Sequence, residues 1–422
     1  MRPFLIVVLL VSLATLSCRK DFPVVGPDST SNLFMGDTKP FKPATRAAME
    51  GVYRVVQGQE FLGDLVALKW SGVANGPDTS FYLSGFFAPG VGYFVVSAGS
   101  LDSTLFFTGE WHKLQKGENG LFHGVVLSTT GGKQLLNPVP VIGRDSITIG
   151  GTWGNGEENP TKNFVLQYDR PLYNGKTFDV LGHRGGGRTS DLLPVSENSV
   201  DMILYAERLG CTAIEIDVHP TKDGVPVLYH DNTLNLRLIQ KCGLVGAVAD
   251  YTYDQLQGLV RLIHGERIPM FREVLDAALY RTKLRMVYID TKPDMPMVPL
   301  YELQQEYMTK AAAAGRQFEV LIGVPSDDKL NEFKTLPNYT QIPSICELTV
   351  DDTRALNSRA WCPRFTLGTQ DDLVAQVHGE GRRAYAWTVD DPQYIQQFMA
   401  AGYDGLLTNY ASLVAYYHYV HQ

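Results

Sequence analysis

Long apolar runs are missing from this sequence after residue 18, where no stretch is long enough to cross a bilayer as a helix. Clustered positive charge is missing too, since 37 Lys and Arg against 45 Asp and Glu leave a formal net charge of −8. Nucleic-acid binding needs clustered cations. The 40 Gly and 23 Pro are spread along all 422 residues, unlike a collagen-like or low-complexity chain. A membrane-embedded transporter and a disordered scaffold are therefore excluded, and nucleic acid is not expected as a partner.

The first 18 residues read as an export signal rather than as part of the fold. Arg2 gives a short positive region, Phe4–Leu16 is apolar, and small Ser17 precedes Cys18. The segment TLSC resembles a bacterial lipobox, in which the cysteine is diacylated and becomes the mature N-terminus. This resemblance implies an exported lipoprotein of the bacterial cell envelope, in the periplasm or at the cell surface and held to the membrane through Cys18. The alternative is an ordinary cleaved signal and a soluble periplasmic protein.

Cysteine is scarce, with five residues in the chain, and none lies in a CxxC pair or a Cys/His cluster. A zinc site is therefore not expected. If Cys18 is lipidated, four cysteines remain and allow three disulfide pairings, among which the sequence does not choose. A buried free thiol is the simpler expectation for Cys211, which comes directly before an apolar strand.

Residues 19–45 are rich in Pro, Ser, Thr and Asp and are expected to form a tether. Residues 46–172 are expected to form an all-β domain, an antiparallel barrel or sandwich, because short aromatic and β-branched segments alternate with Gly, Asn, Asp and Pro turns. The domain resembles a lipocalin-type barrel only faintly, so its role stays open, with an envelope ligand as one possibility. Its tryptophans are expected in the core rather than as ligand stackers. The expected strands are 51–56, 65–70, 81–87, 92–99, 103–111, 120–128, 146–153 and 163–169, and the tryptophans are Trp70, Trp111 and Trp153.

From residue 178 to 422 strand-like and helix-like segments alternate over about 245 residues, the usual size of an eightfold (β/α)8 TIM-type barrel. The chain is thus expected to contain an α/β barrel preceded by an all-β domain. Between the first two strands, residues 196–210 have the apolar spacing of a helix, with Ser196 as the expected cap. The expected strands are 179–183, 213–219, 285–291, 318–323, 341–346, 360–365, 384–389 and 404–408.

In such a barrel the reactive residues lie at the C-terminal ends of the strands. Glu215 and Asp217 stand two apart on one expected strand and so point to the same face, and Asp290 ends the next strand. Carboxylates held close together repel unless a cation lies between them. Three hard oxygen ligands suit one divalent cation, Ca²⁺ or Mg²⁺. The alternative is that these acids pair with Arg184 and Lys292 and hold no metal.

Two histidines complete the group, because His183 and His230 also follow apolar strand segments. Histidines beside carboxylates at a barrel mouth are suited to general acid–base catalysis. The Arg184 guanidinium and the Lys292 ammonium are suited to phosphate oxygens. Together these groups predict the cleavage of a phosphodiester.

Residues 178–418 resemble the glycerophosphodiester phosphodiesterases throughout. The shared motifs occur in the family's order: HRGG (183–186), ENS (197–199), IEIDV (214–218), TKDGVPVLYHD (221–231), IPMFREVL (268–275), AWTVDD (386–391) and GYDGLLTN (402–409). The resemblance implies hydrolysis of a small glycerophosphodiester to glycerol phosphate and an alcohol. It implies these roles: metal ligands Glu215 and Asp217, an acid–base pair His183 and His230, phosphate contacts Arg184 and Lys292, and Glu197 orienting the loop after the first strand.

The chain departs from the family pattern in two places. Asp290 stands where the family usually has Glu, and the loop between HRGG and ENS is a few residues longer. Two other functions stay open: a phospholipase D-like enzyme that cleaves a lysolipid, favoured by the apolar segment 235–251, and a non-catalytic binder of a phosphodiester or lipid in the envelope. Because every candidate residue lies between 183 and 292, the barrel is also expected to be separable from the β domain.

Overall fold

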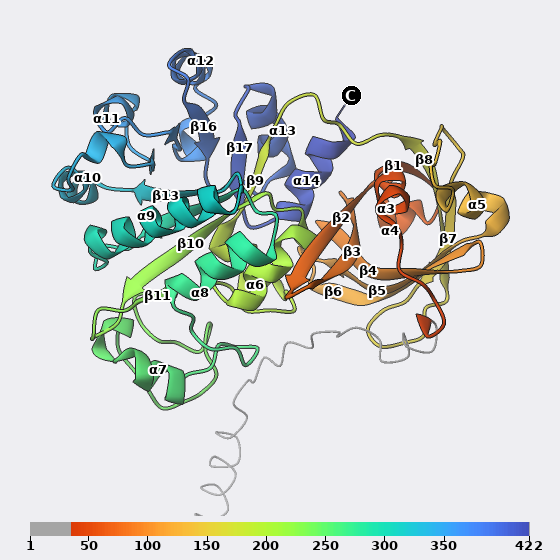
Figure 1. Cartoon of the computed structure of the whole chain (residues 1–422), viewed down its shortest axis with the longest axis horizontal. Helices are drawn as coiled ribbons and strands as arrows, with labels where there is room; N and C mark the ends of the chain where they lie inside the picture. Colours follow the sequence, from red (N-terminus) through yellow and green to blue (C-terminus); the bar gives the residue numbers. More distant parts are fainter. Residues whose placement is uncertain (1–34, 422) are drawn as a thin grey trace, which may run out of the picture.

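The structure, a computed structural model, describes residues 35–421 of the chain. The expected export signal, Cys18 and most of the tether lie outside these residues. Two closed barrels follow one another along the described chain and pack side by side (Figure 1). Within residues 35–421, no helix combines the length and apolar character that crossing a bilayer requires.

The first barrel is antiparallel and closes because its first and last strands pair with each other. Each strand pairs with the next along the chain, so this domain is a barrel and not a sandwich, and all eight expected segments form strands. The strands are β1 (Gly51–Gln57), β2 (Leu65–Asn75), β3 (Asp78–Phe87), β4 (Gly92–Leu101), β5 (Thr104–Lys113), β6 (Glu118–Val126), β7 (Thr148–Trp153) and β8 (Lys162–Arg170). Three short helices accompany them: α3 (Pro43–Met49), α4 (Gln59–Leu62) and α5 (Gly132–Leu135).

Aromatic rings form the centre of this barrel. Phe61 of α4 stacks on Trp153 with ring centroids 3.8 Å apart, and it meets Trp111 edge-on at 4.8 Å. Trp111 and Trp153 are buried, and Trp70 packs half-buried against the same cluster. The prediction that these tryptophans belong to the core is confirmed.

The second barrel is built from eight parallel strands, as the TIM-type prediction requires. β9 pairs with both β10 and β17, which closes the ring. A short strand, β11 (Pro226–Leu228), runs antiparallel to the end of β10. The parallel strands are β9 (Asp179–Gly182), β10 (Ala213–Pro220), β12 (Met286–Thr291), β13 (Glu319–Val324), β14 (Ser344–Cys346), β15 (Ala360–Trp361), β16 (Arg383–Ala386) and β17 (Gly405–Thr408). β15 is shorter than expected, and Pro363, which has no N–H to donate, follows soon after it.

Helices surround this ring and connect its strands. They are α6 (Val200–Tyr205), α7 (Tyr253–Leu259), α8 (Phe271–Asp276), α9 (Met297–Ala313), α10 (Asp327–Phe333), α11 (Val350–Ala355), α12 (Asp371–Gly379), α13 (Pro392–Ala400) and α14 (Ala411–Val420).

The expectation that Ser196 caps α6 is wrong. Asn198 adopts a left-handed φ of 56°, so the helix starts only after Ser199, whose side chain accepts the Met202 N–H at 3.0 Å.

The two barrels share one buried apolar cluster. The outer face of the first barrel packs against α14, which lies between the barrels in Figure 1. Phe86 stacks on Tyr419 of α14 at 6.4 Å, and the Tyr93 hydroxyl lies 3.3 Å from that of Tyr205. The residues of the first barrel in this cluster are Ala67, Phe86, Val91, Tyr93, Val95 and Leu114.

Cysteines carry no cross-link in the described part of the chain. Cys211, Cys242, Cys346 and Cys362 are all free thiols there, and Cys242 alone of these four is not buried. Burial raises the pKa of the Cys211 thiol well above its usual value, so this sulfur is an unreactive core atom. The free-thiol expectation for Cys211 is therefore the one that the structure supports.

Candidate active site

Three carboxylates meet at the C-terminal ends of β10 and β12. Glu215 and Asp217 lie on one face of β10, and Asp290 of β12 stands directly opposite Asp217 in the parallel register. One oxygen of each carboxylate lies within 4.8 Å of the others. Glu215 and Asp217 are buried, and Oε1 of Glu215 has no hydrogen-bond partner. A buried, unpaired carboxylate oxygen beside two other acids fits a hard divalent cation.

The charges of this cluster are strongly interdependent. Burial, and then the neighbouring Asp217 and Asp290, raise the pKa of Glu215 well above its usual value. Burial also acts on Asp217, but Lys292 and the two site histidines outweigh it and lower the pKa of that carboxyl. Lys292 lies between two of the acids, with Nζ 2.6 Å from Asp217 and 2.5 Å from Asp290. Lys292 thus forms ion pairs with Asp217 and Asp290 but not with Glu215.

His183 follows β9 and is oriented by a residue more than 200 positions later in the chain. Its Nδ1 lies 2.7 Å from Oδ1 of Asn409, and Asn409 is in turn held by Asp390 through its amide and its backbone N–H. An amide oxygen can only accept, so Nδ1 carries the hydrogen and Nε2 presents a lone pair. That Nε2 lies 3.8 Å from Glu215. Burial and the adjacent Arg184 lower the His183 pKa to about 4.

His230 is oriented by a carboxylate instead of an amide. Its Nδ1 lies 2.6 Å from Oδ1 of Asp231, and Asp231 is held by Arg237 at 2.6 Å and by Asn235 at 2.7 Å. Its Nε2 accepts from Arg184 at 2.9 Å. The ring centroids of His183 and His230 are 6.4 Å apart. Both histidines therefore turn Nε2 toward the same small space.

Arg184 connects these groups. It stands in a left-handed conformation with φ 56° inside the 3₁₀ turn η2 (His183–Gly185), and its backbone N–H donates to Glu215 at 2.8 Å. Its guanidinium donates to Glu197 at 2.8 Å as well as to His230. Glu197 thus contacts Arg184 directly, in the loop that it is expected to orient.

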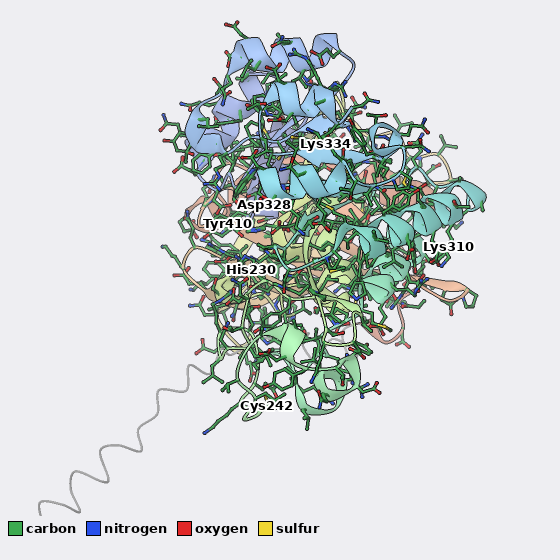
Figure 2. The ribbon with its side chains drawn as sticks, turned by 90° about the vertical axis from the view of Figure 1, so that its left-hand side faces the viewer. His230, Cys242, Lys310, Asp328, Lys334 and Tyr410 are labelled. Atoms are coloured by element: carbon green, nitrogen blue, oxygen red, sulfur yellow. The ribbon has the colours of Figure 1, made fainter. Side chains whose placement is uncertain are left out.

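All seven residues for which catalysis, metal binding or phosphate contact was predicted are brought to this end of the barrel. Figure 2 looks onto the side of the molecule on which His230 lies. A cavity of about 470 Å³ is lined there by His230, Asp290, Lys292 and Lys329, among others. Four residues that hold the site groups were not predicted: Asn409, Asp390, Asp231 and Asn198, whose side-chain amide donates to Asp217 at 2.6 Å. Each lies inside or beside one of the recognised motifs, which is the signal that could have found them.

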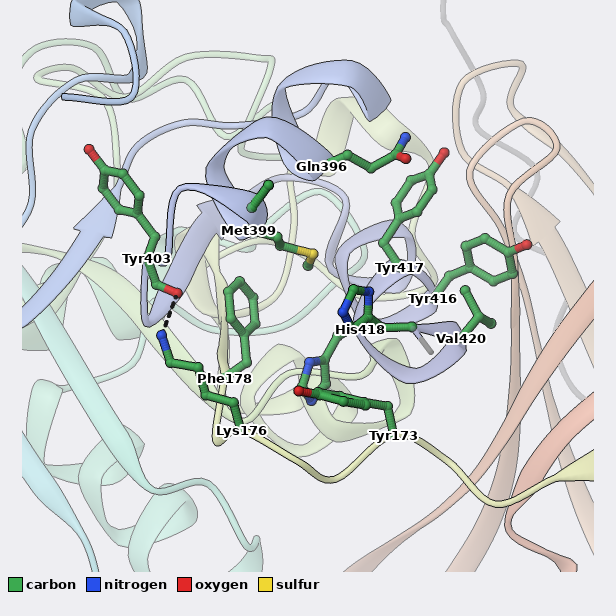
Figure 3. A pocket seen from close by; sticks show the side chains of 12 residues that line it. Tyr173, Lys176, Phe178, Gln396, Met399, Tyr403, Tyr416, Tyr417, His418 and Val420 are labelled. Atoms are coloured by element: carbon green, nitrogen blue, oxygen red, sulfur yellow. Dashed lines mark hydrogen bonds between the residues drawn. The ribbon is translucent and has the colours of Figure 1, made fainter. Parts of the chain in front are cut away.

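A larger cavity of about 740 Å³ lies elsewhere and is not the candidate site. Phe178 and Tyr403, which line it, come just before β9 and β17, so it opens at the N-terminal ends of the strands. Figure 3 shows its mostly aromatic lining, including Tyr173, Tyr417 and His418. The carboxylates lie at the opposite ends of the strands.

Comparison with known proteins agrees with the site. The sequence profile of the glycerophosphoryl diester phosphodiesterase family matches residues 183–413. A glycerophosphodiester phosphodiesterase of Caldanaerobacter subterraneus is 27% identical over 54% of this chain and 93% of its own length. A probable glycerophosphodiester phosphodiesterase 2 of Mycobacterium tuberculosis is 30% identical over 56% of this chain and 88% of its own.

Solved structures also match part of this chain. A glycerophosphodiester phosphodiesterase from Parabacteroides distasonis superposes with a TM-score of 0.44 and 25% identity, covering 56% of this chain and 94% of that one. The family profile matches more than half of the chain and includes every predicted catalytic, metal and phosphate residue. The chain therefore belongs to the glycerophosphoryl diester phosphodiesterase family and is a phosphoric diester hydrolase.

Proposed function

We propose that this enzyme hydrolyses small glycerophosphodiesters to glycerol phosphate and an alcohol. The observation that carries the proposal is the convergence of three carboxylates, two cations and two imidazole Nε2 atoms in one site. Glu215, Asp217 and Asp290 would hold one divalent cation, Ca²⁺ or Mg²⁺, which would supply Lewis-acid stabilisation of the charge that grows on the phosphate. Arg184 and Lys292 bind phosphate oxygens in the same site.

The two histidines divide the proton transfers. His183 carries its hydrogen on Nδ1 against the Asn409 amide, so its free Nε2 accepts the proton of the attacking oxygen. His230 is oriented by the Asp231 carboxylate at 2.6 Å, and its Nε2 accepts an N–H of Arg184. His230 would protonate the leaving alkoxide after Arg184 moves to the phosphate and Nε2 takes up a proton from solvent. An isolated metal site or a passive binding protein needs no such pair.

A substrate panel measured with and without chelator tests the proposal. We expect release of glycerol phosphate from glycerophosphodiesters, and loss of that release in EDTA. Readdition of Ca²⁺ or Mg²⁺ is expected to restore activity and to raise the melting temperature of the wild type but not of Glu215→Ala. Glu302→Ala, which changes an exposed acid of α9, is the matched control. Full turnover in excess EDTA would exclude the metal-dependent mechanism.

The same panel separates a second candidate function. Leu236 and Val245, in the segment that follows His230, are 67% and 78% exposed. Leu236 directly precedes Arg237, which contacts Asp231 of the site, and an exposed apolar side chain there favours a lipid substrate. Turnover of a lysolipid at a higher kcat/KM than glycerophosphocholine would assign the enzyme to lysolipid cleavage instead.

We also propose that the enzyme is exported and held at the bacterial cell envelope through Cys18, with the β domain facing the periplasm or the exterior. The support is the apolar segment Phe4–Leu16 followed by the lipobox-like TLSC. Expression with radiolabelled palmitate tests this placement. We expect label in the membrane fraction of the wild type, and none in Cys18→Ser.

A further inference from the structure

The first barrel reaches the mouth of the second through the turn between β5 and β6 (residues 114–117). This β5–β6 turn meets the mouth loop (residues 187–196), which is the stretch that is longer than in the family. Both sides of the contact line one narrow crevice, formed by His112, Lys113, Leu114, Gly117, Glu118, Asn119, Asp191 and Leu192. The contact is tight, since a Cβ placed on Gly117 would lie 2.6 Å from Cδ1 of Leu192.

Leu192 is held in an unusual backbone conformation at this contact. Its φ of 58° is left-handed, a region that leucine avoids because its Cβ crowds the backbone. Such a conformation persists where the surroundings impose it. The next residue, Leu193, is fully buried and belongs to the same apolar cluster as Leu114 of the turn. The β5–β6 turn therefore packs directly against the strained end of the mouth loop.

The other end of the same loop segment holds Glu197. Leu192 closes the 3₁₀ turn η3 (Thr189–Asp191), with its N–H bonded to the Thr189 carbonyl at 3.2 Å. The Thr189 N–H donates to Oε2 of Glu197 at 2.8 Å, and the Glu197 N–H donates back to the Thr189 hydroxyl at 3.1 Å. This reciprocal pair fixes both the backbone and the carboxylate of Glu197.

Glu197 in turn holds the Arg184 guanidinium of the site. Its Oε1 accepts from Arg184, whose guanidinium also donates to His230. Its Oε2 has a second, longer contact with Arg237 at 3.4 Å. If the Thr189 bond loosens, Arg237 can draw the carboxylate away from Arg184. Direct contacts thus run without a gap from the first barrel to the guanidinium.

We propose that the N-terminal barrel positions Arg184 for catalysis, with Leu192 of the mouth loop as the positioning residue that the β5–β6 turn holds in place. This inference rests on the phosphate-binding role proposed for Arg184. A planar guanidinium recognises phosphate through two parallel N–H groups, so its orientation matters as much as its charge. The first barrel is then part of the enzyme's active-site scaffold.

Variants of the full chain test this role. Leu192→Ala removes the contact, and we expect kcat/KM for glycerophosphocholine to fall about tenfold, since small displacements of a positioning group are costly. Phe86→Leu is the matched control, because Phe86 is buried in the same interface but packs on Tyr419 of α14. It is expected to lower the melting temperature while kcat/KM stays within about twofold of wild type.

A double-mutant cycle separates positioning from loss of stability. If Leu192 acts through Glu197, adding Leu192→Ala to Glu197→Gln causes no further loss of kcat/KM. Multiplied losses in the double variant would overturn the proposal. Should Leu192→Ala fold poorly, Leu192→Gly takes its place, because glycine accepts the left-handed φ while also lacking the side chain.

Hydrogen exchange tests, independently of turnover, whether Leu192 holds the Thr189 backbone in place. The Thr189 amide is expected to exchange faster in Leu192→Ala and at the wild-type rate in Phe86→Leu. Unchanged exchange of Thr189 in Leu192→Ala would overturn the positioning role, even if the wild type were inactive on every glycerophosphodiester. A wild type that is inactive on every glycerophosphodiester would overturn the proposed function. It would not alter the conclusion from Thr189 exchange about the contact between Leu192 and the β5–β6 turn.

Discussion

His183 and His230 both present Nε2 to the site, but different partners hold their Nδ1 atoms. A neutral amide holds His183 and a carboxylate holds His230. Because each ring is oriented by a hydrogen-bonded partner, the loss of either ring removes a positioned proton acceptor or donor. We expect His183→Ala and His230→Ala each to lower kcat by about 10²- to 10⁴-fold.

Steady-state kinetics with a saturating glycerophosphodiester, together with far-UV circular dichroism, checks this expectation. His421→Ala serves as the control, because that exposed ring belongs to the other end of the barrel. Near-native kcat in either site variant would remove that histidine from the chemistry. It would also favour a passive binding protein.

Glu347 is a half-buried acid outside the carboxylate cluster, and it makes the stability of the fold depend on pH. Burial is the main cause that raises its pKa to about 7, with Asp290 adding to the effect. Its carboxyl accepts a hydrogen bond from the Tyr288 hydroxyl. In the unfolded chain the same group ionises near its ordinary value. The folded state thus loses stability between that value and pH 7, since ionising Glu347 costs more in the fold than in water.

Removing this charge is expected to stabilise the protein at high pH. Glu347→Gln keeps the shape and an acceptor for Tyr288, so the free energy of unfolding should rise by about 1–3 kcal/mol at pH 8 and change little at pH 4. Urea unfolding in the presence of chelator at the two pH values measures both quantities. An equal gain at both pH values would show that packing, not ionisation, is responsible.

At the scale of elements, strand register explains why so much of the site could be predicted. Two residues apart on β10, Glu215 and Asp217 had to share a face, and the parallel pairing sets Asp290 opposite Asp217. Asn409 and Leu192 were not predictable in the same way. The partner of Asn409, His183, lies 226 residues away along the chain, and the partner of Leu192, Gly117, lies in the other domain. No local sequence pattern encodes such contacts. The sequence left barrel and sandwich open for the same reason, because closure depends on the pairing of β1 with β8.

The start of α6 shows a local signal that was misread. Both Ser196 and Ser199 precede the apolar stripe, and only the left-handed Asn198 between them decides which one caps the helix. Ser199→Ala should therefore lower the free energy of unfolding by about 1 kcal/mol. Ser190→Ala, at an exposed position of the mouth loop, should change it by less than about 0.5 kcal/mol. Equal effects in urea titrations of the two variants would contradict the assignment of the cap.

At the scale of the whole molecule, the two barrels behave as one packed body. The apolar cluster contains side chains from both, and Tyr205 of α6 bonds to the buried Glu110 of β5 at 3.3 Å. Even the connecting segment is fixed, since the Tyr173 N–H donates to the Tyr419 carbonyl at 3.0 Å. The connecting segment is thus anchored at Tyr173 and at the buried Phe178, while residues 174–177 between them are exposed.

This shared core changes what is expected of the separated barrel. From the sequence, a chain starting near Asn174 should be soluble and fully active, since every reactive residue lies after it. The structure argues for a different result: such a fragment exposes the partners of Phe86 and Tyr93 on α14 and α6, and the mouth loop loses its contact with the β5–β6 turn.

We expect residues 174–422 to melt at a lower temperature than the full chain and to keep no more than about a tenth of its kcat/KM on glycerophosphocholine. Gel filtration, calorimetry and kinetics of the purified fragment measure these quantities, and Phe86→Leu in the full chain supplies the control for interface loss alone. A monomeric fragment with full-length kcat/KM would show that the first barrel neither holds the fold together nor positions Arg184.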